Sequence, residues 1–398
     1  MKILFVIDKL SRYTGTGLYA EQMVKQLGML VDWHELLVLN QHENWPRGLQ
    51  QRITQHRPDI VHMLYGRPRM IFRVGLVLRR YDVIKIVSVH NVPPQEFRIG
   101  GLYSWRSGYW YVRNLRYFYS RSVFLFALRH YYDALVTVSE STLWQLDKPS
   151  KRKAYKVSEG MVYDTSPEKR DLASRDDILG EQKGPLIVTV CAFIFQKGIH
   201  RMLDILPSIV SEYPQVLYVV AGKKRDPAYF EYIQNLVRVR KLDQYVRLLP
   251  DADPAVLASL YENYDLYVQP SYEEGFCLTF LEALAKKKGS DRPFVLVGGT
   301  TGELPALMAI AGMDSFVFSA RSETSFAEKV LLALKTLKGG LHPNVLWQEL
   351  VETYSWEHAA RNMIKLYDAL TAVKPINRSG VRSSLLPYDK AVSSTERM

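Results

Sequence analysis

The feature that most constrains the fold is an alternation of short apolar runs with longer segments of helical spacing. The first run, KILFVI at residues 2–7, has the near-continuous apolar character of a strand buried on both faces. A TGTG loop and the helical pattern LYAEQMVKQL follow it. Further strand candidates are WHELLVLN, DIVHMLYG, VIKIVSVHN and ALVTVSE. Strands that alternate with helices in this way predict a doubly wound, parallel α/β sheet.

The same pattern restarts in the second half of the chain. The strand candidates there are PLIVTVCAF, VLYVVAG, YVRLLP, DLYVQPS and PFVLVGG. A polar, charged segment separates the two halves and is typical of a linker. A chain of 398 residues is also too long for one ordinary core. We therefore predict two Rossmann-like α/β domains that face each other across a cleft, at 1–163 and 185–355, with a linker at 164–184.

The end of the chain has two parts. Residues 356–373 form an amphipathic helical pattern, and residues 374–398, rich in Ser, Lys and Arg, are expected to be disordered. Two cysteines are too few for a disulfide framework or a four-cysteine zinc site, which favours a reducing compartment. The apolar start is too short for a signal peptide, and the most apolar later segment carries charges. We expect a cytoplasmic protein that does not span a membrane.

The segment YEEGFCLTFLEALAKK follows a strand candidate at the edge of the sheet where ligands bind in such folds. A helix should begin near Leu278, so that its first N–H groups suit a phosphate. Glu282 is expected in the first helical turn and Glu274 in the loop before it. Carboxylates beside a phosphate are useful if they accept hydrogen bonds from hydroxyls, and sugars supply such hydroxyls. The segment thus predicts a site for a phosphorylated sugar compound.

The string PSYEEGFCLTFLEALA resembles the Glu-x7-Glu motif of the family 4 retaining glycosyltransferases, which have the GT-B fold. Three further segments are similar to the family in the expected order: QKG, GGTTGELPAL and SWEHAARNMIKLYDAL. The resemblance implies that the first domain lies on the acceptor side and that the second binds a nucleotide sugar. It implies that the helix at 356–373 crosses back to the first domain. No cofactor and no metal are implied, because the nucleotide diphosphate sugar is a substrate.

The resemblance also implies roles for individual residues. Lys197 would hold the donor diphosphate, Glu282 the ribose, and Glu274 the hydroxyls of the donor sugar. His90 would contact that sugar from the first domain, and His90, Glu274 and Lys197 are the residues expected at the reacting atoms. The remaining donor-binding residues would contribute backbone close to the phosphates: Gly15, Gly17, Gly275, Phe276, Cys277 and Leu278.

The chain departs from the family's pattern at two places. The family usually has an arginine five residues before Lys197, where this chain has Ala192, and a glycine where it has Cys277. Losing one of two cations that face a diphosphate lowers donor affinity by about 10- to 100-fold. Lys223 and Lys224, which follow the next strand, are candidates to replace the missing charge.

Other interpretations of these residues remain open. Glu282 could serve only the helix dipole, and His90 could be a core histidine, the role we favour for His62. Asp251 and Asp253 form a D-x-D pair, which binds metal in another glycosyltransferase architecture. Because Pro254 follows, we interpret Asp253 as a helix cap.

Residues 97–132 combine 13 aromatic residues and six arginines with no acidic residue. Residues 1–150 hold 20 Lys and Arg against 11 Asp and Glu, so this half carries most of the net charge of +11. Such a surface suits the phosphates of an anionic membrane; a buried helix pair or single-stranded nucleic acid are the alternatives, and no nucleic-acid motif accompanies the segment.

The sequence therefore predicts a retaining, metal-independent hexosyltransferase. It would move a sugar from a nucleotide diphosphate sugar to a hydroxyl of a lipid-linked or cell-surface glycan intermediate at the cytoplasmic face of a membrane. The alternative is a non-catalytic GT-B subunit that binds a partner glycosyltransferase or a glycan, for which Ala192 is the best evidence.

Overall fold

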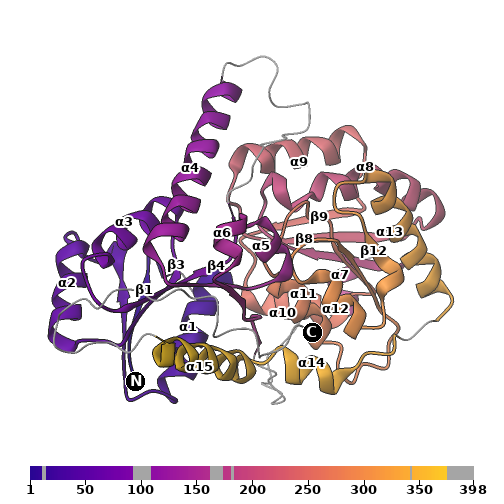
Figure 1. Ribbon diagram of the computed structural model, residues 1–398. Helices are drawn as coiled ribbons and strands as arrows, with labels where there is room; N and C mark the ends of the chain where they lie inside the picture. The colour runs from indigo at the N-terminus through magenta and orange to yellow at the C-terminus, as the bar shows by residue number, and fades with distance from the viewer. Residues whose placement is uncertain (11–14, 93–108, 162–173, 181–182, 341–342, 374–398) are drawn as a thin grey trace. The chain divides into compact units, whose positions relative to one another are not determined.

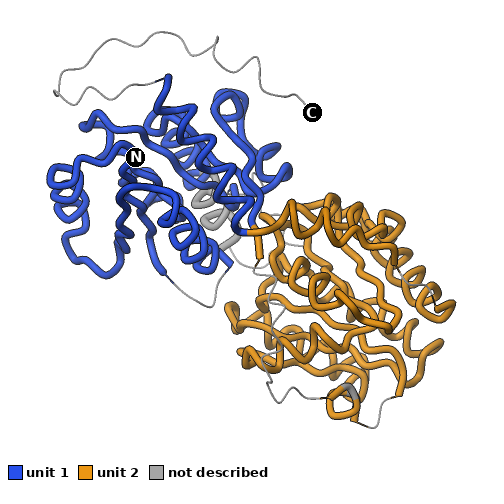
Figure 2. The backbone as a smooth tube through the Cα atoms, turned by 90° about the horizontal axis from the view of Figure 1, so that it is seen from below, with its two compact units in different colours: residues 1–159, 356–398 blue, residues 160–355 orange. Residues whose placement is uncertain are grey.

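The protein consists of two compact units. The computed structural model describes residues 1–10, 15–92, 109–161, 174–180, 183–340 and 343–373. Unit 1 comprises Met1–Glu159 and Trp356–Met398, and unit 2 comprises Gly160–Ser355 (Figure 2). The chain thus leaves unit 1 after Glu159 and returns to it after Ser355.

Unit 1 is built on a six-stranded parallel sheet of order β2-β1-β3-β4-β5-β6 (Figure 1). Its strands are β1 (Lys2–Ile7), β2 (Trp33–Val38), β3 (Ile60–Tyr65), β4 (Ile84–Val89), β5 (Ala134–Thr137) and β6 (Ala154–Lys156). Its helices are α1 (Gly15–Gly28), α2 (Trp45–His56), α3 (Pro68–Leu78), α4 (Tyr109–Tyr131), α5 (Glu140–Gln145), α6 (Lys148–Lys151) and α15 (Trp356–Val373), with a 3-10 turn η1 (Leu39–Gln41). The strand order reverses between β1 and β3.

Unit 2 repeats this architecture with a different strand order, β12-β11-β10-β7-β8-β9, again all parallel. Its strands are β7 (Leu186–Val190), β8 (Leu217–Gly222), β9 (Val246–Pro250), β10 (Leu266–Gln269), β11 (Val295–Gly299) and β12 (Val317–Phe318). Its helices are α7 (Arg175–Leu179), α8 (Ile199–Glu212), α9 (Pro227–Val239), α10 (Pro254–Asn263), α11 (Leu278–Ala285), α12 (Leu304–Ile310), α13 (Glu323–Lys338) and α14 (Trp347–Thr353), with 3-10 turns η2 (Phe195–Lys197) and η3 (Asp314–Phe316). The predicted pair of doubly wound α/β sheets is therefore confirmed.

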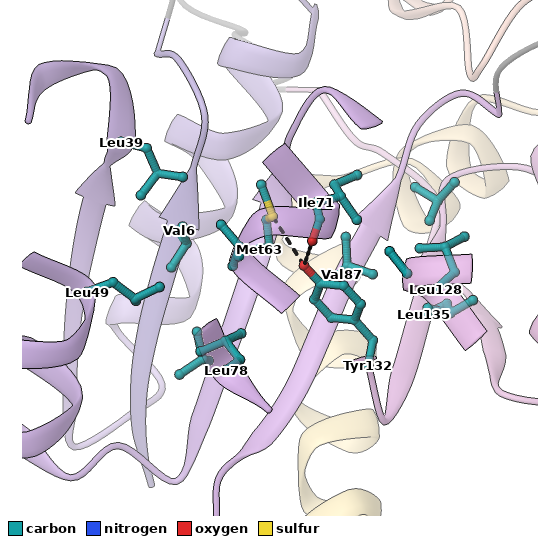
Figure 3. Close-up of a cluster of buried hydrophobic side chains, with 14 of the residues drawn as sticks. Val6, Leu39, Leu49, Met63, Ile71, Leu78, Val87, Leu128, Tyr132 and Leu135 are labelled. Carbon is teal, nitrogen blue, oxygen red and sulfur yellow. Dashed lines mark hydrogen bonds between the residues drawn. The ribbon is translucent and has the colours of Figure 1, made fainter. Parts of the chain in front are cut away.

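The core of unit 1 lies between one face of its sheet and the helices that follow the strands. Val6, Met63 and Val87 come from three neighbouring strands, and Leu78 comes from α3 (Figure 3). Tyr132 closes this cluster at the end of α4, and its hydroxyl donates to the carbonyl oxygen of Ile71 at 2.8 Å. Because helices cover the sheet, its strands are apolar along their length and form the continuous apolar runs seen in the sequence.

Helix α15 is anchored in unit 1 by hydrogen bonds as well as by its apolar face. The Tyr367 hydroxyl bonds to Nδ1 of His62 at 2.6 Å, and Nε2 of His62 bonds to Ser88 at 2.9 Å. The hydroxyl of Tyr19 on α1 reaches the same Ser88 at 3.0 Å. All four side chains are buried. His62 is therefore a core residue, as its sequence context favours.

The structure differs from the sequence predictions at the sheet edges and at one helix start. β6 and β12 were not predicted, because three and two residues are too few to form a recognisable apolar run. The prediction of a TGTG loop was wrong at its glycines, since α1 already includes Gly15 and Gly17. Apolar periodicity begins at Leu18 and marks where the helix buries side chains, which is later than where the backbone starts to turn.

Several predicted segments lie partly outside the described residues. Within the predicted linker the structure describes α7, which Ser174 and Asp177 start with a reciprocal capping box. Residues 164–173 and the tail 374–398 are outside it. None of the helices in the described ranges is long and apolar enough to cross a lipid bilayer.

Burial of His62 predicts that unit 1 loses stability in acid. Burial lowers the pKa of His62 to about 3, from an ordinary value of 6.5. The folded protein therefore keeps His62 neutral while the unfolded chain takes up a proton, so the free energy of unfolding should fall as the pH drops from 6.5 towards 3. One such group contributes at most about 1.4 kcal/mol per pH unit.

Denaturant unfolding at a series of pH values checks this expectation. His62→Gln, which keeps hydrogen-bonding groups but does not titrate, should show a shallower decline than the wild type. An equal slope in the two proteins would mean that His62 does not hold a depressed pKa.

Candidate functional site

The strand order of unit 2 places its ligand-binding edge at the carboxyl ends of β7 and β10, where the order reverses. The chain after β7 leads to Lys197, and the chain after β10 leads to Glu274. Both N–H···O contacts between the Lys197 ammonium and the two carboxylate oxygens of Glu274 are 2.7 Å long. Two residues 77 positions apart are thus joined at the switch point of the sheet.

Glycine allows the two loops to approach so closely. Gly198 follows Lys197 with φ of +66°, and a Cβ atom there would lie 2.2 Å from the carbonyl oxygen of Pro270. The N–H of Tyr272 donates to the carbonyl oxygen of Gln196 at 2.9 Å and ties the loops together. Glycine is therefore favoured after Lys197, because only glycine allows both the left-handed turn and the close approach of the two loops that bring Lys197 to Glu274.

The carboxylate of Glu274 is buried and surrounded by donors. Besides Lys197, its Oε1 accepts hydrogen bonds from the Gln269 amide at 2.8 Å and from the Ser271 hydroxyl at 2.6 Å. The Glu274 backbone N–H donates to the Thr301 hydroxyl at 2.9 Å. Burial lowers the pKa of Lys197, but the Glu274 carboxylate, with smaller contributions from Cys277 and Cys191, raises it, and the net pKa is raised. The lysine is therefore charged, and the contact fixes both side chains in place.

Helix α11 starts directly after this carboxylate, as predicted. Its N-cap is Cys277, which has a left-handed backbone with φ of 91°. The backbone of Gly302 packs against the same loop, where a Cβ atom would lie 2.8 Å from that of Glu274. The family's glycine at position 277 is thus explained by backbone conformation, because a side chain is strained at this φ.

Glu282 lies in the second turn of α11, not in the first as predicted. Counting from Leu278, it is the fifth helical residue, so the helix dipole favours it little. The Tyr261 hydroxyl donates to its Oε2 at 2.9 Å. Burial raises the pKa of Glu282, and the hydrogen bond from Tyr261 offsets only part of that rise. Tyr261 therefore positions one oxygen of the Glu282 carboxyl group.

A buried arginine supports the site and was not predicted. The side chain of Arg201 on α8 has 0% exposure, and its Nε bonds to Glu323 at 2.8 Å. Its Nη1 donates to the carbonyl oxygens of Pro270 at 3.0 Å and Ala320 at 3.2 Å. The guanidinium also lies over the Tyr272 ring at 4.6 Å. Arg201 thus joins the loops after β10 and β12 to α8; its signal was a cation inside the apolar pattern IHRMLDIL.

Ala192, which stands where the family usually has an arginine, lies next to a lysine that follows the neighbouring strand. Val190 pairs with Ala221, and the ladder continues through the bond from the N–H of Phe193 to the carbonyl oxygen of Lys223. Ala192 is therefore opposite Lys223, and paired residues project to the same face of a sheet. Lys223 is exposed. Lys224 instead lies over the Phe230 ring at 4.6 Å.

The predicted residues of the first half belong to unit 1. His90 follows β4 and is buried, with Nδ1 bonded to Glu159 at 2.9 Å and Nε2 to the carbonyl oxygen of Leu64 at 3.1 Å. A carboxylate and a carbonyl oxygen both accept hydrogen bonds, so each ring nitrogen of His90 faces an acceptor. Gly15 and Gly17 lie in the first turn of α1. Glu159 was not predicted as a partner of His90.

Asp253 is a helix cap, as predicted. Its carboxylate accepts from the N–H of Ala255 at 2.8 Å, and Pro254 occupies the first position of α10. The companion Asp251 accepts from the N–H of Lys224 at 3.3 Å. Among the described residues, no three His, Cys, Asp or Glu side chains are grouped so that they could hold a metal ion.

The aromatic and arginine-rich stretch is described only from Tyr119 onward at the level of side chains. There it divides between core and surface: Phe124 is buried, while Tyr119 is 62% and Phe126 is 45% exposed. On α5, Trp144 is 72% exposed and lies under the ammonium of Lys151 at 4.6 Å. Neither the membrane nor the core interpretation therefore accounts for all the aromatic residues.

Comparison with known proteins finds a family similarity within unit 2. Residues 173–336 match the family "Glycosyl transferases group 1". The chain is 24% identical over 193 residues to a phosphatidylinositol N-acetylglucosaminyltransferase component of Arabidopsis thaliana, covering 48% of this chain and 40% of that protein. It is 24% identical over 353 residues to a glycogen synthase of Fusobacterium nucleatum, covering 80% of this chain and 73% of that enzyme. The chain thus spans two fifths of the length of the first relative.

The fold is shared with solved glycosyltransferases. Sucrose-phosphate synthase of Thermosynechococcus elongatus superposes with a TM-score of 0.70 at 16% identity, covering 94% of this chain and 100% of that one. This likeness establishes the predicted GT-B fold.

The left-handed backbone at position 277 predicts that glycine is more stabilising than alanine there, the reverse of the usual order inside a helix. Both Cys277→Gly and Cys277→Ala remove the thiol, but only alanine keeps a Cβ at φ of 91°. The glycine variant should therefore have the higher free energy of unfolding, by about 1 kcal/mol. Chemical denaturation of the two variants measures the difference. An alanine variant as stable as the glycine variant would show that residue 277 is not held at positive φ.

Proposed function

We propose that this protein, whose residues 173–336 match the group 1 glycosyl transferases, transfers a sugar from a nucleotide diphosphate sugar to a hydroxyl acceptor with retention of configuration. The observation that carries the proposal is the contact between Lys197 and Glu274 at the switch point of unit 2. A cation and a buried, hydrogen-bonded carboxylate lie there beside the start of α11. The first suits a diphosphate and the second suits sugar hydroxyls.

The ion pair leaves capacity for the donor. An ammonium has three N–H donors, and Glu274 takes two of them, one for each oxygen. The third can donate to a phosphate oxygen while the ion pair holds Lys197 in place. The first N–H groups of α11 add a second source of positive potential for the phosphate nearest the sugar.

In the proposed step the bond between the anomeric carbon and the diphosphate oxygen breaks, and the acceptor oxygen bonds to the same face of that carbon. The acceptor's proton passes to the departing phosphate oxygen. Lys197 and the start of α11 stabilise the charge that develops on the diphosphate, and Glu274 orients the sugar. No metal ion and no cofactor take part in this proposal. The role of His90 at the sugar stays a prediction; because Glu159 and Leu64 hold both of its ring nitrogens, it would act through its ring edge or its backbone.

We further propose that the acceptor is lipid-linked and that the protein works at the cytoplasmic face of a membrane. The exposed rings of Tyr119, Phe126 and Trp144 support this part, as does the cation at Lys151. Aromatic rings and basic side chains together suit the headgroup region of an anionic bilayer. The curated relative named for phosphatidylinositol is compatible with such an acceptor.

The second candidate is a non-catalytic GT-B subunit that binds a partner glycosyltransferase or a glycan. Ala192 favours it, because the usual second cation is absent from that position. The two candidates differ in whether unit 2 binds nucleotide sugars.

Removing the Glu282 carboxylate should weaken donor binding. If Glu282 accepts ribose hydroxyls, Glu282→Ala lowers the affinity for the donor by about 10- to 100-fold, the value of a hydrogen bond to a charged group. Titration calorimetry with nucleotide sugars measures it, after a thermal-shift screen has found one that binds. Glu262→Ala, at a 40% exposed position on α10, is the matched control and should bind normally. Unchanged affinity in a folded Glu282→Ala variant would remove Glu282 from the site.

Lys223 should supply the charge that Ala192 lacks. Since the two positions are register neighbours, Lys223→Gln should weaken binding of a nucleoside diphosphate by about tenfold. Ala192→Arg should restore it in the Lys223→Gln background. In the wild-type background the added arginine should help less, because two neighbouring cations repel each other. A Lys223→Gln variant that binds as tightly as the wild type would contradict this assignment.

A further inference from the structure

Unit 1 has a switch point of its own, between β1 and β3, and its carboxyl edge carries a fixed cation. Asp8 directly follows β1, and Arg67 follows β3 and occupies the N-cap position of α3. Arg67 donates from Nε to Oδ2 of Asp8 at 2.6 Å and from Nη2 to Oδ1 at 3.2 Å. Its backbone N–H also reaches Oδ2, at 3.3 Å. An ion pair thus joins the ends of β1 and β3, the two strands between which the strand order reverses.

The burial of the two partners is very unequal. The Asp8 side chain is 3% exposed, whereas the Arg67 side chain is 69% exposed. A guanidinium has five N–H donors, and the two side-chain bonds to Asp8 use two of them. Asp8 also raises the pKa of Arg67, through the hydrogen bonds first and through charge second. Asp8 therefore acts as an anchor, and the outer edge of a permanently charged guanidinium is presented to solvent.

An irregularity in the sheet lies just before these residues. The pairing of β1 with β3 shifts by one residue between Val6 and Ile7, so that Leu64 is the extra residue on β3 and has no register partner on β1. The carbonyl oxygen of Leu64 accepts from His90, which Glu159 holds in turn. Bulges re-aim the chain at functional edges of sheets. His90 and Glu159 thus support the strand end from which Arg67 emerges.

Two exposed basic residues lie near the Asp8–Arg67 pair along the chain. Lys9 follows Asp8 directly, and Arg69 lies in the first turn of α3; both are exposed. The first turn of α3 contains no acidic residue. The Asp8 carboxylate offsets part of the Arg67 charge, so Lys9 and Arg69 supply the excess positive charge of this group. A fixed guanidinium with two further cations is the donor set that proteins use for phosphoryl groups.

We propose that this edge of unit 1 binds a phosphoryl group of the acceptor, with Arg67 as the residue that contacts it and Asp8 as the residue that positions Arg67. That the phosphoryl group belongs to the acceptor rests on the proposed sugar transfer, but the binding of a phosphoryl group does not. The phosphoryl group is part either of a soluble phosphorylated polyol or of a lipid headgroup. Both present the same oxygen atoms to Arg67.

The test uses the full chain and one phosphomonoester in two forms. The soluble probe is sn-glycerol 3-phosphate, with glycerol as the uncharged control, and calorimetry measures the binding. The lipid probe is phosphatidic acid in phosphatidylcholine vesicles, with pure phosphatidylcholine vesicles as the control, and co-sedimentation measures the binding. Arg67→Gln should weaken binding of one or both probes by about 10- to 100-fold. Arg79→Gln, an exposed arginine at the other end of α3, should leave it unchanged.

Each outcome decides for or against the site. Arg67-dependent binding of glycerol 3-phosphate supports a soluble phosphorylated acceptor, and Arg67-dependent binding of the vesicles alone supports a lipid headgroup. Absence of binding to both probes, or binding that Arg67→Gln leaves unchanged, overturns the proposal. If Arg67→Gln fails to fold, Asp8→Asn replaces it, because it frees the guanidinium from its anchor and should weaken the same binding. Binding of nucleoside diphosphates to unit 2 is measured in parallel and should be unaffected, so its absence would count against the proposed sugar transfer and not against this site.

Discussion

The contact between Lys197 and Glu274 joins the two strands at which the sheet of unit 2 reverses. Its 2.7 Å distances require the loops after β7 and β10 to approach closely, and Gly198 provides the space. Arg201 holds the second of these loops through the Pro270 carbonyl oxygen. This loop leads into α11, so its contacts help to position the first N–H groups of α11, which are proposed to bind the phosphate. The proposed donor binding therefore depends on the Lys197–Glu274 ion pair, and the ion pair depends on the backbone conformation at Gly198.

Unit 1 uses the same physical device with a more exposed cation. In unit 2 a buried carboxylate holds a partly buried lysine, whereas in unit 1 the buried Asp8 holds an exposed Arg67. Both pairs lie at the carboxyl ends of the strands that flank a reversal. In a parallel sheet the carboxyl ends of neighbouring strands lie at the same edge, and ligands bind at this edge where the strand order reverses. A cation that is hydrogen-bonded to a buried carboxylate is held in one position there. Two domains without recognisable repeats in sequence thus reach similar arrangements through topology.

Sequence patterns predicted what depends on long apolar runs and on local spacing. Ten of the strands and the start of α11 near Leu278 fall in this class, as does the cap at Asp253. Sequence patterns did not predict the features that depend on contacts between residues far apart in the chain. β6 and β12 exist because a neighbouring strand pairs with them, Arg201 is buried because loops far along the chain enclose it, and Glu159 meets His90 only in the folded unit. Glu282 was placed one turn too early although the helix start was predicted correctly, since with Leu278 as the first helical residue Glu282 is the fifth.

The central claim is that the Lys197–Glu274 contact marks the donor site, and calorimetric titration of nucleoside diphosphates tests it most directly. Lys197→Met removes the ammonium, while Lys288→Met removes an exposed one beyond the far end of α11 as the matched control. The account predicts that the wild type and Lys288→Met bind at least one nucleoside diphosphate and that Lys197→Met binds it about 10- to 100-fold more weakly. A wild type that binds none of them, or a folded Lys197→Met variant that binds as tightly as the wild type, would contradict it.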